Sequence, residues 1–263
     1  LYIYSVSFTH KYIIHSKYMS RLQKPFQFLL VRHGESIWNH ENRFTGWCDI
    51  PLSKKGEKQA ESMGQILLEN KIKPHCIFSS ELERCLATSN IIQQKLNTQF
   101  NIYPSWRLNE KSYGDCEGVC RDELVKHMSK DYVSELRRSF FMLPPKLDNE
   151  MKHDFTDYQL KTSEHFYKHD LQNGETKEMV LHRLLPYWYE QIIPKIRSHS
   201  CPLIVTHKHT ARVLIKYLTH MQLTDFDELD FPNSQIHHIK LNSEFFVDDK
   251  LQDITVLKGK HTD

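Results

Sequence analysis

The fold of this chain is decided by one stretch of sequence, Phe26-Gln27-Phe28-Leu29-Leu30-Val31-Arg32-His33-Gly34-Glu35-Ser36. An apolar run ends abruptly there in an arginine, a histidine and a glycine. Uninterrupted apolar runs are typical of buried parallel strands, and open α/β sheets bind ligands where such strands end. We therefore interpret Arg32 and His33 as candidates for an anion site that contains a nucleophile or base. The alternative at this point is a surface arginine beside a histidine that only caps the strand.

Composition limits the possible functions. The chain has 263 residues, of which 39% are hydrophobic, enough for the core of one large α/β domain. The 35 Lys and Arg residues nearly balance the 33 Asp and Glu residues, so no polyanion-binding field exists and nucleic acid is not an expected partner. The 17 histidines are scattered without metal-ligand spacing, and we expect no metal.

The N-terminus and the cysteines bear on location. The apolar start at 1–8 is interrupted by Thr9-His10-Lys11, well short of the roughly 20 residues that span a bilayer, so no membrane association is expected. We predict that residues 1–25 are a poorly ordered extension and that residues 26–263 form one catalytic domain. Widely spaced cysteines without a secretory signal favour reduced thiols and a cytoplasmic protein.

Strand and helix patterns alternate along the rest of the chain, which predicts an α/β fold with a mostly parallel central sheet and helices on both faces. The predicted strands are 26–32, 76–80, 203–207, 236–241 and 254–257. The predicted helices are 54–69, with Ser53 as N-cap, 81–96, 174–197 and 210–221. Residues 101–104 and 106–108 lead into Asn109-Glu110, and this stretch is predicted to form a strand edge. A charged, aromatic insertion with short helical pieces is predicted at about 122–172.

Two of these strands end in histidine, at His33 and at His207. Parallel strands bring their carboxyl ends to the same edge of a sheet, so the two imidazoles can meet there. Arg84, in the first turn of the second helix, and Glu110 would join them. These groups suit phosphoryl transfer without a metal. A neutral imidazole attacks phosphorus, guanidinium groups neutralise its oxygens, and a carboxyl group exchanges the proton.

An ordered series of motifs extends this pattern over nearly everything from Phe26 to about Leu241. The series runs Leu30-Val31-Arg32-His33-Gly34-Glu35-Ser36, Glu41-Asn42-Arg43-Phe44-Thr45-Gly46-Trp47, Ser79-Ser80-x-Leu82-x-Arg84, Trp106-Arg107-Leu108-Asn109-Glu110, Tyr113-Gly114, Arg137-Arg138, Pro144-Pro145 and Gly174-Glu175. It resembles the 2,3-bisphosphoglycerate-dependent phosphoglycerate mutases of the histidine phosphatase superfamily. The resemblance implies a three-layer, phosphoglycerate mutase-like sandwich.

The resemblance also implies roles for individual residues. His33 would be the phosphohistidine nucleophile, with Glu110 as proton donor and acceptor. Arg32, Arg84 and His207 would bind the transferring phosphoryl group. The substrate-binding residues would be Asn39, Thr45, Gly46, Tyr113, Arg121, Arg137, Arg138, Lys208 and His209. For Asn39 and Thr45, a loop or cap hydrogen bond is as good an interpretation. For Arg137 and Arg138, the alternative is a solvated pair of charges.

Departures from the mutase pattern leave three functions open. Lys208 and His209 stand where the mutases have Gly-Asn, and Cys120 and Arg121 stand where they have Asn-Lys. The first function is a glycolytic mutase that interconverts 3-phosphoglycerate and 2-phosphoglycerate with 2,3-bisphosphoglycerate as primer. The second is a metal-independent phosphatase of small phosphate monoesters, which these departures favour. The third is a non-catalytic protein that binds phosphorylated ligands. The expected partner is a small phosphorylated substrate, and a homo-oligomer is left open.

Overall fold

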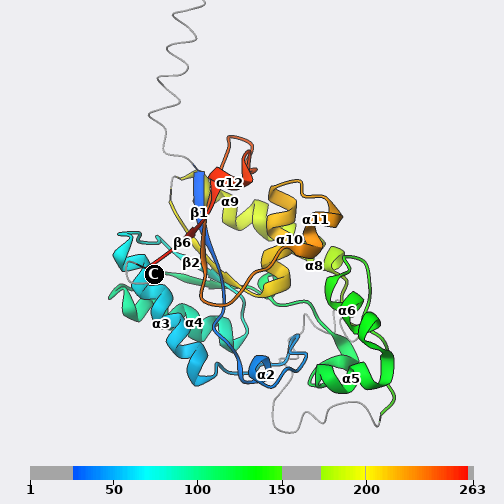
Figure 1. The fold of residues 1–263 in the computed structure, drawn as a ribbon. Coiled ribbons are helices and arrows are strands. Elements are labelled where there is room, and N and C mark those ends of the chain that lie inside the picture. Colours follow the sequence, from blue (N-terminus) through cyan, green and yellow to red (C-terminus); the bar gives the residue numbers. More distant parts are fainter. Residues whose placement is uncertain (1–25, 150–172, 199, 260–263) are drawn as a thin grey trace, which may run out of the picture.

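The computed structural model describes residues 26–149, 173–198 and 200–259 (Figure 1). The predicted extension at 1–25 and the part of the predicted insertion at 150–172 lie outside these described residues.

One six-stranded sheet forms the centre of the molecule, in the order β3-β2-β4-β1-β5-β6. Its strands are β1 (Phe26–Arg32), β2 (Ile77–Ser79), β3 (Ile102–Pro104), β4 (Leu203–Thr206), β5 (Ile236–Leu241) and β6 (Ile254–Leu257). β3, β2, β4 and β1 are parallel neighbours, whereas β5 runs antiparallel to both β1 and β6. The predicted α/β fold with a mostly parallel sheet is therefore confirmed.

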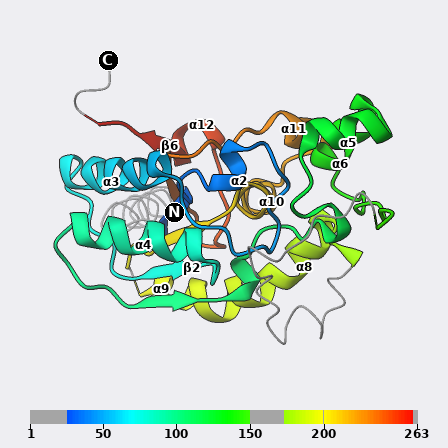
Figure 2. The ribbon, with the colours of Figure 1, turned by 90° about the horizontal axis from the view of Figure 1, so that it is seen from below.

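Helices cover both faces of this sheet (Figure 2). On one face, Leu29 and Val31 of β1 pack into a core with α3 (Lys54–Glu69) and α4 (Glu83–Lys95). On the other face, Phe28 and Leu30 pack against helices from the second half of the chain. The alternation follows from the side-chain period of two along a strand. The sheet with helices on both faces forms the predicted three-layer sandwich.

The second face is covered mainly by α8 (Lys177–Tyr187), η4 (Trp188–Ile192), α9 (Ile193–Arg197) and α10 (Lys208–Leu218). The single helix predicted at 174–197 is wrong in detail, since it begins at Lys177 and widens into a π-helix at η4. Pro194 has no N–H, and its ring would clash with the carbonyl four residues earlier in a regular α-helix. A π-turn before this proline relieves that clash.

The carboxyl ends of β1 and β4 define the edge at which the site lies. Of the stretch predicted as a strand edge, the first part is the strand β3, whereas the part from Trp106 is instead a 3-10 helix, η1 (Trp106–Leu108). The Ser105 hydroxyl accepts the Arg107 N–H at 3.3 Å and starts this turn, so the prediction was wrong for this part. Beside this edge lie α5 (Arg121–Met128), α6 (Lys130–Arg138) and α11 (Leu223–Glu228) (Figure 1).

Three short elements complete the described chain: α2 (Ile37–His40), η2 (Gly114–Cys116) and α12 (Lys250–Asp253). α2 interrupts the loop that follows β1. Its N-cap is Ser36, whose hydroxyl accepts the Asn39 N–H at 3.2 Å. Across the described ranges, no helix has the length and apolar character needed to cross a bilayer.

Candidate active site

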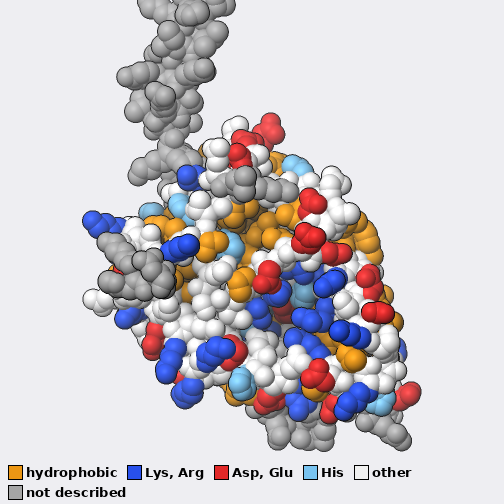
Figure 3. All heavy atoms as spheres, viewed as in Figure 1, with side chains coloured by type: hydrophobic (Ala, Val, Ile, Leu, Met, Phe, Trp, Pro, Cys, Tyr) orange, Lys and Arg blue, Asp and Glu red, His pale blue; other side chains and the backbone are white. Residues whose placement is uncertain are grey.

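A cavity of about 350 Å³ opens at the carboxyl ends of β1 and β4. It is lined by every residue predicted for the site except His207: Arg32, His33, Asn39, Thr45, Gly46, Arg84, Glu110, Tyr113, Arg121, Arg137, Arg138, Lys208 and His209. Figure 3 shows Lys and Arg side chains gathered around this hollow, with acidic side chains along its border near α11. Residues up to 198 positions apart in sequence thus meet in one pocket, from Arg32 to Asp230.

His33 is buried at the base of the pocket, directly after β1. Its Nδ1 lies 2.6 Å from the carbonyl oxygen of Gly34. A carbonyl oxygen only accepts, so Nδ1 carries the proton and Nε2 keeps its lone pair. Burial, with Arg84 and Arg32 nearby, holds the pKa of His33 well below its ordinary value. The ring is therefore neutral at physiological pH, as a nucleophile must be.

His207 lies behind His33 rather than in the pocket wall. It is fully buried, and the two imidazole rings meet edge to face with their centroids 4.8 Å apart. Its Nε2 lies 2.9 Å from the Ser80 hydroxyl. Burial and the positive charge of Arg84 lower its pKa well below the ordinary value. A contact between His207 and the transferring group stays a prediction.

Two arginines near the nucleophile, Arg32 and Arg84, each have a hydrogen-bond donor that is not used within the described residues. Arg84 donates from Nη1 to the Cys48 carbonyl and from Nη2 to the Gly46 carbonyl, each at 2.8 Å, which fixes the loop after α2. The Nε atoms of Arg84 and Arg32 are buried and find no acceptor within the described part of the chain. Unpaired buried donors are costly. Since both line the pocket, an anion bound there would satisfy them.

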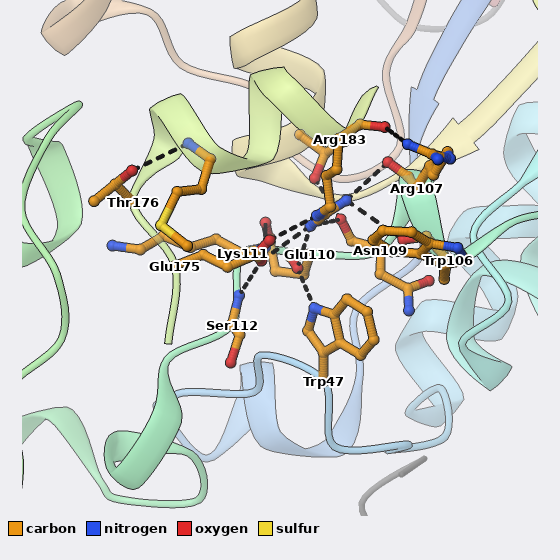
Figure 4. Close-up of polar contacts among 12 residues, drawn as sticks. Trp47, Trp106, Arg107, Asn109, Glu110, Lys111, Ser112, Glu175, Thr176 and Arg183 are labelled. Atoms are coloured by element: carbon orange, nitrogen blue, oxygen red, sulfur yellow. Dashed lines mark hydrogen bonds and ion pairs between the residues drawn. The ribbon is translucent and has the colours of Figure 1, made fainter. Parts of the chain in front are cut away.

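Glu110 follows η1 and is 8% exposed. Its Oε1 accepts the Lys111 N–H at 2.9 Å. Its backbone carbonyl accepts from Trp47 Nε1 at 2.7 Å and from Arg183 Nη2 at 2.9 Å. The carboxyl group therefore stands on a backbone that is held from two directions (Figure 4).

A buried ion pair behind Glu110 provides much of this support (Figure 4). Arg183 Nε lies 2.7 Å from Glu175 Oε1, and Glu175 Oε2 accepts the Ser112 N–H at 2.8 Å. Arg183 also donates to the carbonyls of Arg107 and Asn109. The pair thus clamps both sides of Glu110. The sequence marked Glu175 as part of a motif but gave no signal for Arg183, which is an ordinary helix position on α8.

The same cavity is also lined by Arg121, Arg137 and Arg138 together with Tyr113 and His209. The Tyr113 hydroxyl lies 2.9 Å from His209 Nε2. His209 Nδ1 is buried and without a partner among the described residues. Burial and nearby cations lower the pKa of His209 well below its ordinary value, so this ring is neutral as well.

The carboxyl end of α6, which carries Arg137 and Arg138, meets the start of α8. Lys177, fully buried at the start of α8, donates from Nζ to the carbonyls of Arg137, Arg138 and Ser139 at 2.9, 2.9 and 2.6 Å. It caps the carboxyl end of α6, where both pocket arginines lie.

Gly46 and Thr45 line the pocket beside a buried carboxylate. Gly46 has φ +48°, and a Cβ added there would lie 2.0 Å from Glu117 Oε1, so the position requires glycine. The pKa of Glu117 is raised by burial to about 7, although Ser112 and the Tyr113 N–H donate to it. Asn39 Oδ1 accepts from the Ser36 N–H at 3.3 Å, and so closes a capping box on α2.

Comparison with known proteins places this site in a family. The family model of the histidine phosphatase superfamily (branch 1) matches residues 28–155 and 145–253. A 2,3-bisphosphoglycerate-dependent phosphoglycerate mutase from Hydrogenobaculum sp. is 34% identical over 209 residues, which is 79% of this chain and 83% of that protein. Phosphoglycerate mutase 1 from Saccharomyces cerevisiae is 35% identical over 210 residues, covering 78% of this chain and 83% of that protein.

The chain belongs to the 2,3-bisphosphoglycerate-dependent phosphoglycerate mutase family of the histidine phosphatase superfamily. The resemblance inferred from the sequence is thereby confirmed. Solved structures share the fold. A mycobacterial glucosyl-3-phosphoglycerate phosphatase superposes with a TM-score of 0.64 at 18% identity, covering 88% of this chain and 95% of that chain. The α-ribazole phosphatase from Shigella flexneri gives 0.60 at 20% identity, with the same coverage.

This member of the mutase family also has pocket residues that sequence reasoning missed: Ser134, Arg212, Asp227, Glu228, Leu229 and Asp230. Four of them lie together at the end of α11 and in the residues that follow. Three carry carboxylates, which an anion pocket gave no reason to expect. No motif marked the segment, because acidic residues between a helix and a strand usually belong to a solvated turn.

Among the residues that the structure describes, no cluster of three or more His, Cys, Asp or Glu side chains could hold a metal ion. All six cysteines are described, and each is a free thiol.

Proposed function

We propose that the chain interconverts 3-phosphoglycerate and 2-phosphoglycerate through a phosphohistidine at His33, with 2,3-bisphosphoglycerate as primer. The relatives named as phosphoglycerate mutases support this proposal over most of the chain. The neutral, Nδ1-protonated imidazole of His33 supports it at the level of chemistry.

The proposed reaction needs only this chain's side chains and the substrate. Nε2 of His33 attacks one phosphorus of the primer, the bond to the glycerate oxygen breaks, and Glu110 gives that oxygen its proton. Arg32 and Arg84 neutralise the charge on the phosphoryl oxygens. In the second half, Glu110 takes a proton from the free hydroxyl of a monophosphoglycerate. That oxygen then attacks the phosphohistidine and regenerates His33.

The observation that carries the proposal is the second group of cations, Arg121, Arg137 and Arg138, in the same cavity as His33. Arg32 and Arg84 are sufficient to hold one phosphoryl group. Three more guanidinium groups in the same cavity suit a substrate that carries further anionic groups, such as a carboxylate and a second phosphate.

The deciding experiment measures the turnover of 3-phosphoglycerate with and without 2,3-bisphosphoglycerate, together with the release of inorganic phosphate. We expect primer-dependent isomerisation, little free phosphate, and complete loss of turnover in His33→Ala. Full activity of His33→Ala would refute a phosphohistidine mechanism of either kind.

The alternative is a phosphatase that uses the same His33 intermediate. It is favoured by His209, which lines the pocket and whose buried Nδ1 has no partner among the described residues, because a neutral imidazole there can orient a water molecule toward a phosphohistidine. In the experiment above, phosphate release faster than isomerisation would support this alternative.

A further inference from the structure

An ion pair at the border of the pocket joins Lys208, the first residue of α10, to the acidic segment Asp227–Asp230. Lys208 Nζ lies 2.5 Å from Asp230 Oδ1, and both residues line the cavity. Lys208 is thus a pocket cation whose charge is already matched by a carboxylate of the same chain. Within the described ranges, none of the five pocket arginines named above forms an ion pair with a carboxylate.

The acidic segment is held in this place by contacts on both sides of Asp230. On one side, the buried guanidinium of Arg212 donates to the Phe226 carbonyl and lies over the Phe226 ring. On the other side, Asn233 Nδ2 donates to the backbone carbonyl of His33 at 2.5 Å. Asp230 is therefore positioned against Lys208 by the fold.

The ion pair contributes little to the stability of the fold. The side chains of Lys208 and Asp230 are 29% and 67% exposed. Exposed ion pairs are weak because water and salt screen them. A doubly charged phosphate group competes well with one carboxylate for such a lysine, so the pair can open when a ligand reaches it.

We propose that Asp230 is a specificity determinant that occupies Lys208 and thereby weakens the binding of ligands with two phosphate groups more than that of ligands with one. The inference rests on the proposed function only in taking the pocket as a phosphate-ester site. His33, Lys208 and Asp230 line the same cavity, so a ligand anchored at His33 by its first phosphate would gain a contact of its second with Lys208 by displacing Asp230. The pair thus limits how strongly the pocket retains its most highly charged ligand.

The test uses butane-1,4-diphosphonate and butylphosphonate, whose P–C bonds cannot transfer phosphorus to His33. Their dissociation constants are measured by calorimetry on the full chain and on Asp230→Asn, an isosteric change. We expect Asp230→Asn to bind the diphosphonate about fivefold more tightly, and the monophosphonate less than twofold more tightly. Glu57→Gln, an exposed position on α3 with the same change in charge, controls for net charge and is expected to change neither constant.

The gain must depend on Lys208. In a Lys208→Ala background, Asp230→Asn is expected to change diphosphonate binding by less than twofold. An equal gain with and without Lys208 would overturn the inference, since it would reflect general repulsion by Asp230. An unchanged preference for the diphosphonate in Asp230→Asn would overturn it too. If neither phosphonate binds the wild-type chain, the proposed function falls together with the inference, whereas the other outcomes leave that function intact.

Discussion

At the scale of single residues, a substitution of Glu110 should affect proton transfer without affecting substrate binding. Glu110→Gln keeps the shape and the acceptor for the Lys111 N–H but cannot exchange a proton with the glycerate oxygen. We expect kcat to fall by about 10²- to 10⁴-fold while KM stays within about threefold. Steady-state kinetics with 3-phosphoglycerate and primer measure both. Glu57→Gln on the surface is the matched control, and a kcat within threefold of wild type would exclude Glu110 as the acid.

The sequence predicted the residues at strand ends far better than their partners. His33 and His207 could be placed together because carboxyl ends of parallel strands share one edge. Arg183 and Asp230 could not be predicted, because an arginine within a helix and an aspartate in a turn are ordinary residues there. Their importance arises only from contacts with residues distant in sequence, Glu110 and Lys208. Local patterns contain no signal for such pairs.

At the scale of elements, the junction of α6 with α8 predicts a split between binding and catalysis. Lys177→Met leaves three carbonyls at the end of α6 without a donor, and should loosen the helix end that carries Arg137 and Arg138. We expect KM for 3-phosphoglycerate to rise about tenfold and kcat to fall less than threefold. The free energy of unfolding should drop by about 1–3 kcal/mol.

The control for this prediction is Lys130→Met, an exposed lysine at the other end of α6. It should leave both kinetic constants within twofold of wild type. A Lys177→Met enzyme with unchanged KM would show that α6 holds its arginines without this cap.

The boundaries of helices and strands could be predicted from the sequence where a single local signal, such as an N-cap residue, determines them. Ser53 caps α3 as predicted, since its hydroxyl accepts the Gly56 N–H at 3.1 Å. The prediction failed at Trp106–Leu108, where aromatic and aliphatic residues indicated a strand. A 3-10 turn that starts at Ser105 forms there instead of a strand, and this bend brings Glu110 to the pocket.

At the scale of the whole molecule, four buried histidines with lowered pKa values make stability depend on pH. One of them is His237, whose pKa is lowered by burial to about 4. The pKa values of His33, His207 and His209 lie well below the ordinary value of 6.5 because of burial and nearby cations. Below pH 6.5 the unfolded chain therefore binds protons that the native state refuses, and stability is lost as pH falls. Glu117, with a pKa raised to about 7, acts in the opposite direction, because its native form binds a proton first.

Four histidines against one glutamate leave a net effect of about three protons, so we expect the free energy of unfolding to fall by about 4 kcal/mol per pH unit between pH 6 and 5. Urea unfolding at a series of pH values measures it. His209→Gln should reduce the slope by about 1.4 kcal/mol per pH unit. A flat profile from pH 6.5 to 5 would contradict the assignment of neutral native histidines.

β5 has a consequence for how such a pocket can change over time. It runs against its neighbour β1, so the chain enters this strand at the same edge where β1 ends in His33. The preceding connection, 229–235, therefore reaches the pocket, and it is anchored in the core by the buried Phe231. Exchanges at the polar positions of that connection can retune ligand preference while Phe231 keeps its place in the hydrophobic layer. Evolution and protein engineering can therefore change ligand preference at these positions without changing the residues that stabilise the sheet.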